Sequence, residues 1–248
     1  MNGLRRALRT HLLPRRHTAL LVAIVVAFAA RPLIGDGGLA PIAFSLSFIG
    51  LMLIALYTVQ IDEVANESDG SRPQRRRWSR LGWVLAVIAI IERLALIFDP
   101  TSRLLLIGSI SWLLFFAFVT GTELRAVLRQ RAITAETISM SISIYLLFAL
   151  TWGILYSVIY QLQPGAFSIT AIPAGELFTT FMYFSLTTLS TIGFGDIAPL
   201  TMQSRYAAVA QGIIGQFYLA ILVARLVGMQ MSQSSAPNPS DQPSSRER

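Results

Sequence analysis

Long apolar stretches separated by short polar ones dominate the chain from residue 18 onward. A helix needs about 20 mostly apolar residues to cross the hydrocarbon core of a bilayer. Six stretches have nearly this length and are predicted to be membrane spans: 18–34, 41–57, 81–98, 104–119, 139–160 and 206–229. A seventh segment, 175–190, is too short and too rich in threonine for a full span. The pattern therefore predicts an all-α membrane protein with six transmembrane helices per chain.

The positions of the arginines predict the orientation. They gather in the leader (Arg5, Arg6, Arg9, Arg15, Arg16), after the second span (Arg72, Arg75, Arg76, Arg77, Arg80), after the fourth (Arg125, Arg129, Arg131) and in the tail (Arg246, Arg248). All of these segments lie inside if alternate loops are cytoplasmic, as the positive-inside rule requires. Both termini are then cytoplasmic. Arginine without lysine suggests a GC-rich genome and the short format a prokaryote, so we expect the inner cell membrane.

Composition supports the membrane interpretation and excludes several chemistries. The chain is 54% hydrophobic and only 13% charged, whereas soluble domains carry about 25% charged residues. It has no lysine, no cysteine and two histidines, His11 and His17, which excludes lysine, thiol and Cys/His zinc chemistry. The spans hold no catalytic constellation, so we expect neither an enzyme nor a cofactor. The net charge of +7 comes from arginines beside apolar runs, which indicates membrane topology rather than nucleic-acid binding.

One feature at the N-terminus affects the number of spans. The basic leader, the first apolar stretch and the small residues at 27–30 also fit a cleaved signal peptide. A retained span is favoured because the apolar run continues past Arg31.

Residues 232–248 are rich in Ser, Pro and Gln, so we expect a disordered tail.

The most informative stretch, FSLTTLSTIGFGD at 184–196, lies between the last two spans on the predicted outer side. It predicts a short helix that enters the membrane and an extended strand that returns. Non-helical backbone at membrane depth is tolerated only inside protein or along a water-filled path. Gly193 and Gly195 allow backbone angles that other residues resist, so successive carbonyls can point toward one axis.

The segment Thr191-Ile192-Gly193-Phe194-Gly195-Asp196 resembles the T-V-G-Y-G-D selectivity filter of tetrameric potassium channels. Its Ile/Phe form is also similar to the filters of two-pore-domain potassium channels. The likeness covers about 139–229 and implies a homotetramer with K+ as the permeant ion. It implies K+ binding by Thr191, Ile192, Gly193 and Phe194 within a filter that ends at Gly195, with Asp196, Tyr183, Phe184 and Thr187 at the outer mouth and behind the filter.

Two residues depart from the commonest form of that family's filter. Phe194 replaces a tyrosine, and Phe184 stands where tryptophan is frequent. A hydroxyl–indole bond behind the filter therefore cannot form, and we expect a Tyr183–Asp196 hydrogen bond to stabilise the filter instead. Four copies of Asp196 would concentrate cations at the outer mouth. The alternative for Asp196 is a solvated surface carboxylate.

The last span is predicted to line the pore. Gly212 and Gly215 interrupt its apolar run, either as a hinge for opening or for close helix packing. Gln211 and Gln216 are expected to face the cavity or to bond between subunits. Arg225 lies near the cytoplasmic end, where snorkelling to the interface is favoured over a role in gating.

The first four spans resemble a voltage-sensor module without its sensor. The fourth span, 104–119, contains no charged residue; Arg103 precedes it and Arg125 follows it. Steep voltage dependence requires charges that move through the membrane field. Elsewhere in the module, Glu92 can pair with Arg31. For Glu92, a role as a structural tether between helices is favoured over a role as a ligand or proton sensor.

The connector after the fourth span has amphipathic spacing. Leu124, Val127 and Leu128 lie on one side, Arg125 and Arg129 on another, which predicts an interfacial linker helix. The expected organisation is a leader (1–17), a four-helix module (18–120), this linker (121–138), a pore domain (139–231) and the tail (232–248).

The expected function is passive K+ conduction with little or no voltage dependence. Two alternatives remain: a weakly selective monovalent cation channel, and a non-conducting membrane sensor or scaffold that kept a pore-like hairpin.

Overall fold

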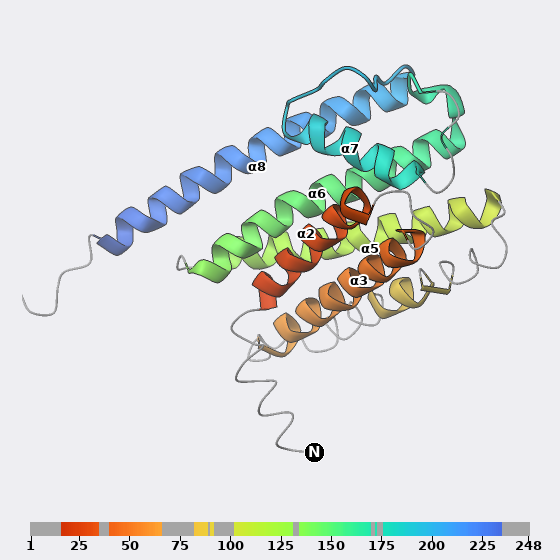
Figure 1. Cartoon of the computed structure of the whole chain (residues 1–248). Helices are drawn as coiled ribbons and strands as arrows, with labels where there is room; N and C mark the ends of the chain where they lie inside the picture. Colours follow the sequence, from red (N-terminus) through yellow and green to blue (C-terminus); the bar gives the residue numbers. More distant parts are fainter. Residues whose placement is uncertain are drawn as a thin grey trace, which may run out of the picture.

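The computed structural model describes residues 16–34, 40–65, 82–88, 90–91, 102–130, 134–169, 172 and 176–234. Its named elements are the helices α2 (Arg16–Ile34), α3 (Ala40–Ala65), α5 (Ser102–Arg129), α6 (Ala135–Leu162), α7 (Leu177–Leu189) and α8 (Met202–Ser234), and the 3-10 turn η2 (Pro164–Ala166) (Figure 1). Throughout the described ranges the only strand-like pairing is one isolated bridge between Phe167 and Pro199. The all-helical prediction is confirmed for this part of the chain.

Among the described residues, three helices are long and apolar enough to cross a membrane: Leu106–Arg129, Ala135–Leu162 and Met202–Arg225. They correspond to the predicted fourth, fifth and sixth spans. The first two predicted spans fall in shorter apolar segments, Arg16–Ala30 of α2 and Leu46–Val59 of α3. Half of the third, 81–98, lies outside the described residues, as does the predicted Glu92–Arg31 contact. A total of six spans therefore stays a prediction.

The prediction of a separate linker helix over 121–138 is wrong. Helix α5 continues without interruption to Arg129, and α6 begins at Ala135. Residues 121–129 contain no proline, and Gly121 has open space around it, so nothing stops the helix there. Thr134 instead starts the next helix, because its hydroxyl accepts the Thr137 N–H at 3.2 Å.

The amphipathic spacing in this region has a different role from the one predicted. Val127 is buried against Met140 and Ile144 of α6, whereas Leu128 remains 55% exposed. The apolar side of the last α5 turns therefore packs against the next helix of the same chain. It does not form the face of an independent interfacial helix.

Helix α6 occupies the centre of the fold, where it packs against α2, α5, α7 and α8 (Figure 1). On one side, α2, α3 and α5 close around a buried aromatic group that includes Phe48, Trp112 and Phe116. The Phe48 ring meets the other two edge-on, with centroids 5.4 Å and 5.8 Å away. Burial of such rings is a large apolar contribution to stability. This packing joins α3 to α5.

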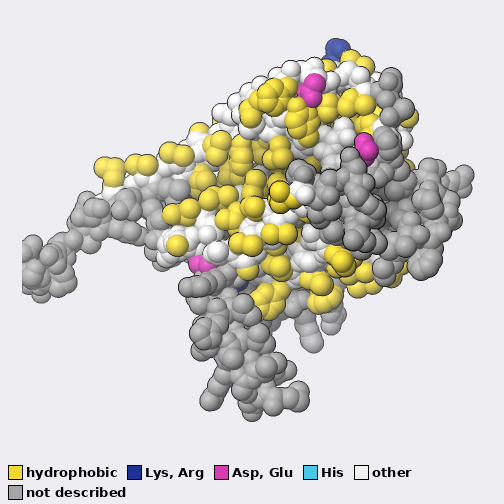
Figure 2. Space-filling model, in the orientation of Figure 1, with side chains coloured by type: hydrophobic (Ala, Val, Ile, Leu, Met, Phe, Trp, Pro, Cys, Tyr) yellow, Lys and Arg dark blue, Asp and Glu magenta, His cyan; other side chains and the backbone are white. Residues whose placement is uncertain are grey.

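Most of α8 has little contact with the rest of its own chain, and its C-terminal half projects beyond the other helices (Figure 1). Tyr206, Val209 and Phe217 are all more than half exposed. Figure 2 shows apolar side chains over much of one face of the molecule, with few charged groups among them. Apolar surface of this extent suits contact with lipid or with other protein chains.

Candidate functional site

Helix α7 is the short helix predicted between the last two spans. Its 13 residues reach about 20 Å, which is less than the hydrocarbon core requires. It packs against both α6 and α8. Phe184 lies in a buried aromatic cluster, with its ring centroid 4.9 Å from Tyr156 and 5.5 Å from Phe167. The contacts of Phe184 are therefore apolar.

After α7 the backbone changes handedness at every second residue. The φ angles of Thr191, Gly193 and Gly195 are 61°, 52° and 79°, and no other described residue has a positive φ. Glycine adopts this conformation readily, whereas it costs Thr191 about 1–2 kcal/mol. Alternation of the two hands brings successive peptide groups to the same side of the chain. The predicted glycine alternation thus coincides with the observed backbone pattern.

The start of this segment is attached to the last turn of α7 by three hydrogen bonds. The Thr187 carbonyl accepts the N–H groups of Ile192 and Gly193 at 2.9 Å and 3.1 Å, and the Thr188 carbonyl accepts that of Thr191 at 3.1 Å. Carbonyls at a helix C-terminus have no partner within the helix and are free to accept these bonds. The Thr187 hydroxyl donates to Phe184 at 3.0 Å. Thr187 therefore contacts the segment through its carbonyl.

The outer half of the segment contacts α7 through side chains. The rings of Tyr183 and Phe194 are stacked, with centroids 6.3 Å apart and planes 1° from parallel. Desolvation of the Tyr183 hydroxyl, together with the nearby Asp196 carboxylate, raises the pKa of Tyr183. Asp196 is exposed, as the alternative of a solvated carboxylate requires, and its predicted hydrogen bond to Tyr183 stays a prediction.

Exposed side chains mark the segment 191–196 in the single chain. Ile192 is 58% exposed and Phe194 68%, whereas Ile197, directly after the segment, is buried. The return path is attached at Ala198, whose N–H donates to Ser168 Oγ at 2.8 Å. One face of the segment is therefore held by its own chain while the other is open.

The two glycines of α8 differ in their surroundings. A methyl group at Gly215 would lie 2.6 Å from Leu189 Cδ1 and 3.1 Å from the Leu189 carbonyl oxygen. Gly212 has nothing within 4 Å of the corresponding position. Gly215 therefore permits close packing of α8 against the end of α7. The hinge alternative stays open for Gly212, and both glycines lie within one continuous helix.

The prediction for Gln211 is wrong, because this side chain faces neither a cavity nor a neighbouring subunit. It is fully buried within its own chain. Its carboxamide donates to Ser185 of α7 and accepts a hydrogen bond from Tyr156 of α6. Gln216, five residues later, is exposed, so its predicted role is still a prediction.

Arg225 contacts the C-terminal end of α5, and its predicted extension to the membrane interface stays a prediction. Its guanidinium donates to the Val127 carbonyl at 2.6 Å and the Leu128 carbonyl at 2.9 Å, and also bonds the Gln130 carbonyl. These carbonyls lie at the C-terminal end of α5, where a positive charge is favourable. Arg225 thus connects α8 to the end of α5, which the sequence analysis did not foresee.

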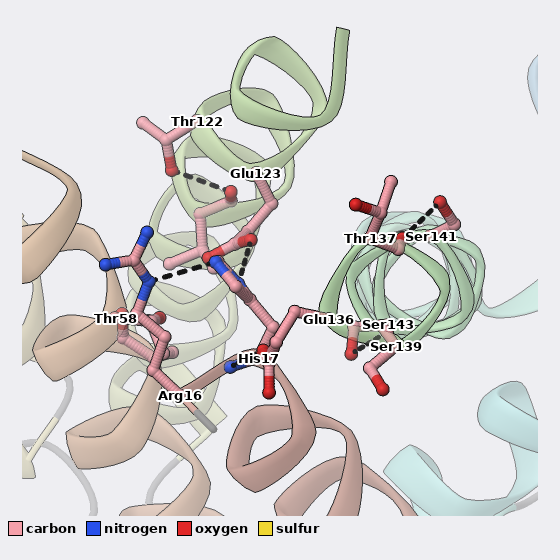
Figure 3. Close-up of polar contacts among 12 residues, drawn as sticks. Arg16, His17, Thr58, Thr122, Glu123, Glu136, Thr137, Ser139, Ser141 and Ser143 are labelled. Atoms are coloured by element: carbon pink, nitrogen blue, oxygen red, sulfur yellow. Dashed lines mark hydrogen bonds and ion pairs between the residues drawn. The ribbon is translucent and has the colours of Figure 1, made fainter. Parts of the chain in front are cut away.

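A second set of polar contacts, which the sequence analysis also missed, joins the beginnings of α2 and α6 to the end of α5 (Figure 3). The Glu136 carboxylate accepts hydrogen bonds from the backbone N–H of His17 at 3.1 Å and from the Thr18 hydroxyl at 2.9 Å. His17 Nδ1 lies 3.2 Å from Glu123 Oε2, and both side chains are buried. Glu136 in the first helical turn was a detectable signal, since acidic side chains favour helix N-termini.

Residues 135–231, which contain α6, α7 and most of α8, match a family model described as "Ion channel". No curated protein and no solved structure matches the chain. The match supports an ion channel of the potassium-channel kind and a function other than enzymatic catalysis. Together with the apolar helices, it supports a multi-pass membrane protein.

Proposed function

We propose that the protein is a potassium-selective channel in which four copies of this chain surround one pore. The observation that carries the proposal is the alternating left-handed backbone at Thr191, Gly193 and Gly195. It occurs directly after the short helix α7, within a region similar to ion channels.

In the proposed filter, backbone carbonyls replace the water around a dehydrated K+ ion. The carbonyls of Thr191, Ile192, Gly193 and Phe194 form successive rings, one oxygen from each chain, and the Thr191 hydroxyl forms the innermost ring. The hydrogen bonds from the backbone N–H groups of Ile192 and Gly193 to the Thr187 carbonyl support this function, because they hold the inner half of the segment at a set distance from α7.

A homotetramer also explains the open face of the segment. Ile192 and Phe194 are mostly exposed in one chain, and a large apolar side chain is favoured where a neighbour covers it. Closed cyclic symmetry then places the four segments around one axis. The exposed apolar side of α8, including Val209 and Phe217, is available to neighbouring chains and to lipid.

Conduction in this proposal has little or no voltage dependence. Between residues 104 and 122, α5 carries no charged residue, so it offers no charge for the membrane field to move. The exposed Asp196 carboxylates are proposed to concentrate cations at the outer mouth. As the positions of the arginines predict, both termini lie on the cytoplasmic side of the inner membrane in this proposal.

Ion flux from purified protein in liposomes tests the proposal. We expect K+ flux that greatly exceeds Na+ flux at all voltages, and its loss in Gly193→Ala, since alanine resists the left-handed φ at that position. Gly165→Ala is the matched control, because Gly165 also has open space but no positive φ. Equal K+ and Na+ permeation would instead establish a weakly selective cation channel, and absence of flux a non-conducting sensor or scaffold.

A further inference from the structure

A fully buried hydrogen-bond chain connects the three helices of the region 135–231. The Tyr156 hydroxyl of α6 donates to Gln211 Oε1 of α8 at 2.6 Å. Gln211 Nε2 donates to the Ser185 hydroxyl and carbonyl of α7 at 2.7 Å and 3.0 Å. The Ser185 hydroxyl donates in turn to the Ala149 carbonyl of α6 at 2.6 Å. Each polar atom of the Gln211 and Ser185 side chains thus has a partner.

The contact points lie on matching helical faces. Tyr145, Ala149 and Tyr156 are separated by four and seven residues, which places them on one side of α6. Ser185 and Leu189 are four residues apart on α7, and the Tyr145 hydroxyl donates to the Leu189 carbonyl at 3.1 Å. Helix α7 is therefore attached to α6 at two levels, Ser185 and Leu189, and to α8 through Gln211 at the first of these levels.

Directional contacts of this kind restrict a motion that apolar packing restricts poorly. The Phe184 ring can slide against Tyr156 and Phe167 at small cost, since apolar contact is non-directional. A rotation of α7 about its axis would separate Ser185 from Gln211 and leave buried polar atoms without partners, at a large cost in a dry interior. The carboxamide thus sets the rotation of α7.

That rotation determines where the proposed filter lies. Thr187, two residues after Ser185, accepts the amides of Ile192 and Gly193. When α7 rotates, this carbonyl moves with it, and so does the inner half of the segment 191–195.

We propose that Gln211 is a positioning residue that holds the filter in its K+-selective conformation by fixing α7 through Ser185. The role in selectivity rests on the function proposed above; the role in holding α7 and the filter does not. Gln211 itself touches no ion in this proposal, because it is buried behind α7.

The test uses the full-length protein in lipid and two substitutions. Gln211→Met keeps the length of the side chain and removes its amide, and Tyr156→Phe removes only the hydroxyl. Gln203→Met is the control, since Gln203 is an exposed glutamine of the same helix. One measurement is hydrogen–deuterium exchange over 185–195, and the other is the K+/Na+ permeability ratio from reversal potentials.

We expect the amides of Ile192 and Gly193 to exchange roughly tenfold faster in both variants, because the local opening that exposes them becomes more favourable. The K+/Na+ permeability ratio should fall at least severalfold, while Gln203→Met behaves like the unmodified protein. The double variant should show less than the sum of the two effects, since both residues act in one chain of bonds.

Unchanged exchange at Ile192 and Gly193 overturns the proposal. Faster exchange spread evenly over α6, α7 and α8 also overturns it, because that result indicates general loss of stability. If the unmodified protein is K+-selective, an unchanged K+/Na+ permeability ratio in the variants also overturns the proposal. If Gln211→Met does not fold, Tyr156→Phe decides. If the unmodified protein passes K+ and Na+ alike, the proposed function fails, and exchange alone decides whether Gln211 positions the segment.

Discussion

The ring of Tyr183 lies parallel to the ring of Phe194, with 6.3 Å between the two centroids. Tyr183 belongs to α7 and Phe194 to the segment that follows it, so this stack attaches the outer half of the segment to the helix. The Tyr183 hydroxyl also lies near the Asp196 carboxylate, where the predicted hydrogen bond would form a second attachment. The two contacts can be separated by substitution.

Tyr183→Phe keeps the stacked ring and removes the hydroxyl. We expect K+ selectivity to remain and the conducting state to become shorter-lived by about two- to tenfold, as the loss of one hydrogen bond of roughly 0.5–1.5 kcal/mol implies. Single-channel recordings measure this lifetime. Tyr57→Phe, on α3, is the control. Unchanged open-state lifetimes in Tyr183→Phe would show that the Asp196 contact does not stabilise the filter.

Gly215→Ala and Gly212→Ala form a matched pair. The added methyl at Gly215 meets buried Leu189, and such overpacking costs about 1–3 kcal/mol. At Gly212 the space is open, and alanine favours the helix by up to about 1 kcal/mol. We expect a lower melting temperature and reduced K+ flux for Gly215→Ala only. A large change in channel opening with Gly212→Ala at unchanged stability would favour the hinge.

Arg225→Met removes the cation at the end of α5. Hydrogen bonds from a charged group contribute about 1.5–3 kcal/mol, so the melting temperature of the purified protein should fall by several degrees. Arg225→Lys should restore part of the loss, since an ammonium group carries the charge without the planar geometry of guanidinium. Arg125→Met, at an exposed position of α5, is the control. Equal melting temperatures for the two methionine variants would contradict a stabilising role.

Glu136→Ala removes the carboxylate that accepts the His17 backbone N–H and the Thr18 hydroxyl at the start of α2. Loss of a helix cap costs about 0.5–2 kcal/mol, so the amides at the start of α2 should exchange faster while those of α7 do not. Hydrogen–deuterium exchange of a peptide that includes His17 measures this effect. Glu176→Ala is a suitable comparison, because Glu176 precedes α7 without a side-chain capping bond. Unaltered exchange at His17 would show that Glu136 does not cap α2.

Much of the architecture was predictable because membrane spans depend on composition and length. The fourth, fifth and sixth predicted spans lie within α5, α6 and α8, and α7 falls within the predicted 175–190. Helix ends were less predictable. The amphipathic spacing around Val127 was correct, but nothing in the sequence showed whether its partner was lipid or α6.

The sequence alone determined the apolar helices and the glycine alternation at Gly193 and Gly195, because these depend on local composition and on the conformational freedom of single residues. Only the tertiary structure decided the partners of polar side chains: Gln211 with Tyr156 and Ser185, Arg225 with the end of α5, and Glu136 with the start of α2. Their partners lie 26 to 119 residues away. A buried polar group requires some partner, but only packing of the helices determines which one comes within hydrogen-bonding distance.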